Sequence, residues 1–140
     1  MAKDEAVPVT GGCLCGGVRY EIHGGFLRAG YCHCSRCRRH SGSAFGIQGR
    51  ARREDFRLLH GADLLRTYRP GGDGAVKVFC TVCGSSLFGG TFPDGPELTI
   101  RLGTVDGDPG IRPQFHLFVG SKAVWHEITD DLPRYDALKP

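Results

Sequence analysis

The sequence contains no run of apolar residues that approaches the roughly 20 needed to cross a bilayer as a helix. Its first twelve residues lack the basic start and apolar stretch of a secretory signal. Long segments with a helical hydrophobic period are also missing, because 22 glycines and 8 prolines interrupt the chain. We therefore expect a cytoplasmic chain without a membrane partner, built from short strands and turns.

A strong excess of charge of one sign is missing as well. The net charge is +3, whereas a dedicated nucleic-acid-binding domain is expected to be strongly basic. Nucleic acid is therefore not the expected partner. The arginines are nevertheless concentrated between Arg36 and Arg53, where they form either a solvated basic face or a clamp for the carboxylates of a small thiol. This arginine cluster comprises Arg36, Arg38, Arg39, Arg50, Arg52 and Arg53.

The length of 140 residues suits one domain. We expect a polar tail over residues 1–10, one zinc domain over residues 11–130 and a second tail over residues 131–140. Apolar and polar alternation and turn residues predict a mainly antiparallel β fold with at most short helices. A short helix is expected over residues 35–41, with turns at 70–74 and 106–110. The expected strands span residues 18–22, 27–32, 43–48, 56–59, 64–68, 75–80, 85–88, 97–102 and 115–119.

Seven cysteines stand out in this composition. An odd number leaves one cysteine over in any disulfide scheme, and thiols stay reduced in the cytoplasm. Reduced cysteines that cluster in the sequence typically bind metal or perform redox chemistry. The three groups are Cys13 with Cys15, Cys32 with Cys34 and Cys37, and Cys80 with Cys83.

The first and last groups are pairs that suit one metal ion. Cys13 and Cys15 are two apart, so on an extended strand they point to the same side. Cys80 and Cys83 form a C-x-x-C motif followed by Gly84, which suits a tight turn around an ion. Together the pairs supply the four sulfurs of a closed tetrahedral zinc site. Buried free thiols and a redox motif are the alternatives; the redox motif expects a βαβ context that the sequence does not have.

The middle group leaves three ligands, Cys32, Cys34 and Cys37. Three protein ligands with one open position are the arrangement of a catalytic zinc. Such a zinc binds an incoming thiolate or polarises a carbonyl group. Three alternatives stay open: weak metal binding, an empty cluster of reactive thiols, or a fourth ligand supplied by His33 or His40.

Four ordered blocks of the sequence resemble the glutathione-dependent formaldehyde-activating enzyme family, which includes the centromere protein V domain. They are Gly12–Gly16, Tyr31–Cys37 with Ser41–Phe45 after it, Phe79–Gly84, and Val119–Glu127. The resemblance implies a zinc-bound antiparallel β fold of the Mss4-like, or β-tent, type. It also implies a structural zinc on Cys13, Cys15, Cys80 and Cys83, and a catalytic zinc on Cys32, Cys34 and Cys37.

The activity implied by the resemblance is carbon–sulfur lyase chemistry of the S-(hydroxymethyl)glutathione synthase type, which joins formaldehyde to glutathione. The chain is similar in size to small bacterial members, so we expect a small thiol and an aldehyde adduct as the substrate. Two alternatives are a non-catalytic zinc module for a protein or nucleic-acid partner and a scaffolding zinc domain with an empty triad.

Several other residues are candidates with a plainer interpretation beside the functional one. His116 and His126 are possible proton carriers, because histidine titrates near neutrality, or packed or surface histidines. Phe45, Phe115 and Trp125 either wall a pocket or belong to the core. The sequence leaves both questions to the tertiary structure.

Overall fold

The computed structural model describes residues 7–72 and 74–138. Residues 1–6 and 139–140 of the two expected tails, and Asp73 of the expected turn, lie outside the described residues. The strands are β1 (Val9–Gly12), β2 (Arg19–Ile22), β3 (Arg28–Cys32), β4 (Gly46–Arg52), β5 (Phe56–His60), β6 (Leu65–Tyr68), β7 (Val76–Cys80), β8 (Ser86–Gly90), β9 (Glu97–Arg101) and β10 (His116–Leu117). The helices are α1 (Ser35–Ser41) and the 3₁₀ turns η2 (Arg53–Asp55), η3 (Ala62–Leu64), η4 (Leu102–Thr104) and η5 (Val119–Ser121).

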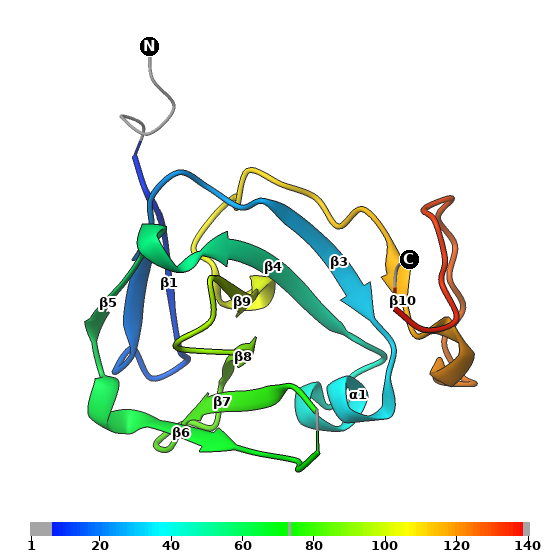
Figure 1. Ribbon diagram of the computed structural model, residues 1–140, viewed down its shortest axis with the longest axis horizontal. Helices are drawn as coiled ribbons and strands as arrows, with labels where there is room; N and C mark the ends of the chain where they lie inside the picture. The colour runs from blue at the N-terminus through cyan, green and yellow to red at the C-terminus, as the bar shows by residue number, and fades with distance from the viewer. Residues whose placement is uncertain (1–6, 73, 139–140) are drawn as a thin grey trace.

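The strands form two sheets. One sheet has the order β1-β2-β5, and the other has the order β10-β3-β4-β9-β8-β7-β6. Figure 1 shows β1 and β5 at one side of the molecule and β10 at the other. Every described strand pair is antiparallel except β10, which runs parallel to β3. The predicted mainly antiparallel β fold with at most short helices is confirmed.

The core lies between the two sheets, and it follows from the period-2 alternation of strand side chains. Tyr20 and Ile22 of β2 are fully buried, and they belong to one cluster with side chains of the larger sheet. In β9, Leu98 and Ile100 enter this cluster, so Thr99 and Arg101 between and after them face the opposite side. The larger sheet therefore has one apolar face in the core and one polar face.

An aromatic group fills the middle of the core. The ring of Phe88 is stacked on Phe92 at 4.4 Å and meets Tyr20 and Phe56 edge-on at 5.4 Å each. The hydroxyl of Tyr20 hydrogen-bonds Thr104 Oγ1 at 2.7 Å, and burial raises the pKa of Tyr20 to about 12. These contacts join β2 and β5 of the smaller sheet to β8 of the larger one.

The helix α1 begins and ends as the sequence predicts. Its N-cap is Cys34, whose sulfur accepts a hydrogen bond from the Cys37 backbone N–H at 3.3 Å. Gly42 ends the helix with a φ of 69°, a left-handed conformation that glycine adopts readily. Within the described residues, no helix is long and apolar enough to cross a membrane.

Three parts of the chain differ from the expectations. Val9 and Thr10, expected in a tail, belong to β1, which pairs with β2. The strand expected over residues 43–48 is instead β4, from Gly46 to Arg52. The expected second tail also contributes to the sheet edge, because Tyr135 N–H donates to the His116 carbonyl at 2.9 Å. All three differences come from hydrogen bonds between main-chain groups, which leave no hydrophobic pattern in the sequence.

Candidate metal centres

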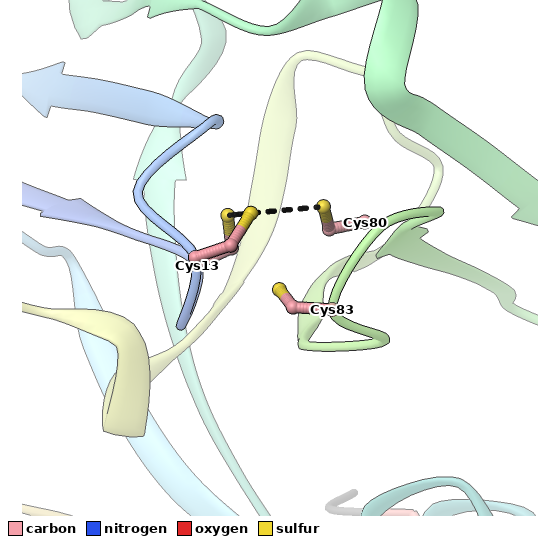
Figure 2. A group of neighbouring side chains, drawn as sticks. Cys13, Cys80 and Cys83 are labelled. Carbon is pink, nitrogen blue, oxygen red and sulfur yellow. Dashed lines mark hydrogen bonds between the residues drawn. The ribbon is translucent and has the colours of Figure 1, made fainter.

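The four cysteines of the two pairs converge from two distant parts of the chain. Cys13 and Cys15 follow β1, whereas Cys80 ends β7 and Cys83 lies in the turn before β8. Their sulfur atoms all lie within 4.8 Å of one another. Figure 2 shows the sulfurs of the labelled residues Cys13, Cys80 and Cys83 turned toward a common centre. We call this group the four-cysteine cluster.

The geometry of the four-cysteine cluster fits zinc. Zinc–sulfur bonds of about 2.3 Å in a tetrahedron place the sulfurs about 3.8 Å apart. The sulfur of Cys15 lies 3.5 Å from that of Cys13 and 3.9 Å from that of Cys80. Gly84 turns the chain behind the second pair with a φ of 78°. The donor set is therefore that of a closed structural zinc site.

Polar groups around the four-cysteine cluster favour the thiolates of Cys13 and Cys83. The Val18 N–H donates to Cys13 Sγ at 3.2 Å. Ser85 has its hydroxyl 3.2 Å from Cys83 Sγ, and hydrogen bonds from this hydroxyl and from the Ser85 backbone lower the pKa of Cys83 to about 5. Metal-binding cysteines must be deprotonated, so this environment suits a metal ligand.

The remaining cysteines form a second group at the end of β3 and the start of α1. The sulfurs of Cys32, Cys34 and Cys37 also lie within 4.8 Å of one another, and we call this group the three-cysteine cluster. Cys32 and Cys37 are buried, whereas Cys34 is partly exposed. No histidine, aspartate or glutamate of the described residues joins the group as a fourth ligand. Three sulfurs with one open side fit a zinc that retains a free coordination position.

Cys37 carries the most polar environment of the three-cysteine cluster. Gln48 Nε2 donates to its sulfur at 3.3 Å, and Lys77 Nζ lies 3.4 Å from the same sulfur. Hydrogen bonds from Cys32 and Cys34 lower the pKa of Cys37, and the positive charges of Lys77 and Arg101 lower it further against the opposing effect of burial. The surroundings of Cys37 therefore favour its thiolate form.

The three-cysteine cluster opens onto a cavity of about 340 Å³ above the polar face of the larger sheet. Leu117 and Phe118 supply part of its wall, and Phe118 has a φ of 56°, which is uncommon for a residue other than glycine. The cations that line the cavity are Arg36, Arg50, Lys77 and Arg101, and no carboxylate of the described residues lines it. The cavity therefore favours an anionic ligand.

The candidate histidines face away from the three-cysteine cluster. His33 Nε2 lies 2.8 Å from His116 Nδ1, and His116 Nε2 lies 3.1 Å from both carboxylate oxygens of Asp130. His40 Nδ1 lies 2.8 Å from Ser86 Oγ. Neither His33 nor His40, the two candidates for a fourth ligand, belongs to the group of ligand atoms within 4.8 Å of one another. His126 is partly buried, with its ring 5.4 Å from that of Phe45.

The His33–His116–Asp130 chain links the cysteine segment to the carboxy-terminal part of the protein. Burial, followed by repulsion from His116, lowers the pKa of His33 to about 4, so its ring is neutral at pH 7. A carboxylate only accepts, so His116 Nε2 donates to Asp130. The Nδ1 atom of His33 is buried and has no partner among the described residues. His116 is thus a packed histidine, which is the plainer of the two interpretations of the sequence.

Members of the arginine cluster, and likewise the three aromatic candidates, lie at different places in the tertiary structure. Of the six arginines, Arg36 and Arg50 line the cavity, whereas Arg53 donates to the carbonyl of Gly95 at 3.2 Å. The aromatic residues separate in the same way, since Phe45 is partly buried, Phe115 lies against Gly30, and Trp125 is 72% exposed.

Three residues that shape the cavity cannot be recognised from the sequence. Lys77, Gln48 and Arg101 stand on β7, β4 and β9, where a polar residue between apolar or small neighbours normally marks a solvent-facing position. Lys77 and Arg101 are instead 5% and 8% exposed. Only the pairing of these strands beside α1 places the three next to Cys37.

Comparison with known proteins agrees with this geometry. The family model described as glutathione-dependent formaldehyde-activating enzyme matches residues 8–121, which contain both cysteine clusters. A crystal structure of a Rhodobacter sphaeroides protein is 32% identical to the chain, covers 71% of this chain and 89% of that chain, and superposes with a TM-score of 0.58. The chain belongs to the glutathione-dependent formaldehyde-activating enzyme family.

Proposed function

We propose that the protein is a zinc-dependent carbon–sulfur lyase that acts on the adduct of a small, glutathione-like thiol and an aldehyde. The observation that carries the proposal is the three-cysteine cluster, whose open side faces the 340 Å³ cavity. Catalytic zinc sites have three protein ligands and one open position, whereas structural sites are closed. The thiol ligands must be reduced, so the activity belongs in a reducing compartment such as the cytoplasm.

The two clusters have different roles in this proposal. The four-cysteine cluster holds a structural zinc that joins the segment after β1 to the β7–β8 turn, and its ligands are Cys13, Cys15, Cys80 and Cys83. The three-cysteine cluster holds the catalytic zinc on Cys32, Cys34 and Cys37. Formaldehyde is the typical aldehyde of the family, and other small aldehydes suit the same cavity.

Zinc bound to the three-cysteine cluster supplies a Lewis acid with an open coordination position. The protein fixes this cluster, because Gln48 and Lys77 both contact Cys37 Sγ. The cavity holds thiol and aldehyde together, which replaces a bimolecular encounter. In synthesis, a carbon–sulfur bond forms, the carbonyl π bond breaks, and the oxygen takes the proton that the thiol loses. In the lyase direction, the carbon–sulfur bond breaks, the carbonyl π bond re-forms, and the hydroxyl proton returns to the thiol.

The exchange of ¹³C-formaldehyde between its free and thiol-bound forms, followed by NMR, tests the function. Protein with two zinc ions per chain is expected to accelerate this exchange for at least one thiol of a panel that includes glutathione. Cys34→Ser is expected to retain one zinc ion and to lose the acceleration, while Ser35→Ala, beside it, serves as the matched control. Equal rates in wild type and Cys34→Ser, or no acceleration with any thiol, would contradict the proposal.

Lys77→Met is expected to weaken zinc binding by the three-cysteine cluster about 10- to 100-fold, the usual effect of removing a group that supports a metal ligand. Loss of the ammonium group leaves less positive charge beside Cys37, so its thiolate becomes less favourable. Competition with a chromophoric chelator measures the zinc affinity of both clusters in one titration. The affinity of the four-cysteine cluster serves as the internal reference. An equal loss at both clusters would point to a general folding defect instead.

A further inference from the structure

The polar face of the larger sheet carries two buried cations that pair with no carboxylate of residues 7–72 and 74–138. Lys77 of β7 and Arg101 of β9 line the floor of the cavity, and both are more than nine-tenths buried. Lys77 contacts the sulfur of Cys37. Arg101 differs, because its Nε and Nη1 atoms are buried and have no hydrogen-bond partner among the described residues.

Other arginines of the protein show how unusual Arg101 is. Arg19 is paired with Asp106, Arg28 with Glu97, and Arg112 with Asp108, and all three are more exposed than Arg101. A buried charge without a partner carries a large desolvation cost. The charge of Arg101 favours the thiolate of Cys37, but no acceptor of the described residues takes hydrogen bonds from its Nε and Nη1 atoms, which indicates that an anion supplied by a ligand completes its hydrogen bonding.

The position of Arg101 places this anion close to the three-cysteine cluster. Arg101 Nη1 and Cys37 Cβ lie 3.2 and 3.4 Å from the point that a Cβ on Gly46 would occupy, so the two side chains are neighbours. Arg36 also lines the cavity, but its side chain is exposed. A cation on the floor beside the sulfurs reaches a group near the reacting atoms, whereas an exposed cation reaches the distant end of a substrate.

We propose that Arg101 binds a carboxylate that is attached one or two carbons from the reacting sulfur or from the reacting carbonyl carbon. The ligand class is therefore a short mercapto acid or a 2-oxo acid with an aldehyde group, such as glyoxylate. Guanidinium binds carboxylate through charge-assisted hydrogen bonds, which are strengthened where water is excluded. The reaction of such a ligand rests on the proposed function, whereas its binding by Arg101 does not.

Calorimetric titration of the zinc-loaded protein with mercaptoacetate and with 2-mercaptoethanol tests the thiol source. Wild type is expected to bind mercaptoacetate about 10- to 100-fold more tightly, the effect of one charge-assisted contact. Arg101→Met is expected to abolish this preference: the two affinities become equal, because any effect of the lost charge on the three-cysteine cluster acts on both thiols alike. Arg112→Met, which removes an exposed arginine elsewhere, should behave as wild type. Zinc content and circular dichroism verify that each variant is folded and loaded, and Arg101→Lys should keep part of the preference.

Exchange rates with glyoxylate and glycolaldehyde, at a fixed concentration of 2-mercaptoethanol, test the aldehyde source. A lower KM for glyoxylate that is lost in Arg101→Met assigns the carboxylate to the aldehyde. In either experiment, a preference for the ligand with a carboxylate that depends on Arg101 supports the inference. Equal affinities and KM values in wild type, or preferences that survive in Arg101→Met, overturn it. Absence of turnover contradicts the proposed lyase and leaves the calorimetric result valid.

Discussion

Replacing Cys80 with serine is expected to prevent stable folding of the protein. Cys80 is fully buried at the end of β7, and its sulfur lies 3.9 Å from that of Cys15. Structural zinc contributes about 10–16 kcal/mol of apparent binding free energy in zinc-finger peptides. The free energy of unfolding of a whole domain is only about 5–15 kcal/mol. Loss of one of four ligands therefore removes a large share of the stability.

The measurement is zinc content per chain together with thermal unfolding by circular dichroism. Cys80→Ser should be largely insoluble, or should lack the cooperative transition of the wild type. Cys34→Ser is the matched comparison, because it also removes a cysteine but from a partly exposed position outside the core. It should lose one zinc ion and keep the transition. A wild-type transition in Cys80→Ser would show that the four-cysteine cluster does not support the fold.

Replacing Phe88 with alanine is expected to lower the free energy of unfolding by about 3–5 kcal/mol. Phe88 is fully buried and contacts the rings of Tyr20, Phe56 and Phe92. Truncation removes these contacts and leaves a cavity between the two sheets, which the surrounding strands fill only partly.

Denaturant unfolding of the zinc-loaded protein measures this loss. Leu59→Ala in β5 is a suitable control, since Leu59 is 47% exposed and its truncation should change the free energy by less than about 0.5 kcal/mol. Phe88→Leu should fall between the two. A loss below about 1 kcal/mol in Phe88→Ala would mean that the aromatic group does not hold the sheets together.

Most of the fold could be predicted because its strands alternate apolar and polar residues. The segments around β2, β7 and β9 carry this signal clearly, and the structure confirms them. The expected strand over residues 43–48 begins earlier than β4, because the core-facing positions of β4 are Gly49 and Ala51, which give no apolar period. The alternation does not predict β1 for the same reason: Val9 and Thr10 lie in the expected tail, and Gly11 and Gly12 give no apolar period before β2 pairs with them.

The sequence by itself determined the three groups of cysteines, because the spacing of ligands within a turn or a strand is a local property of the chain. That the two pairs meet is decided by the tertiary structure, which brings their sulfurs within 4.8 Å of one another. It could not determine what surrounds the three-cysteine cluster. Lys77 and Arg101 lie on different strands, and their burial beside Cys37 follows from a sheet order that is not the chain order. Long-range strand pairing alone buries these two cations, which look exposed in the sequence, and places them at the floor of a cavity.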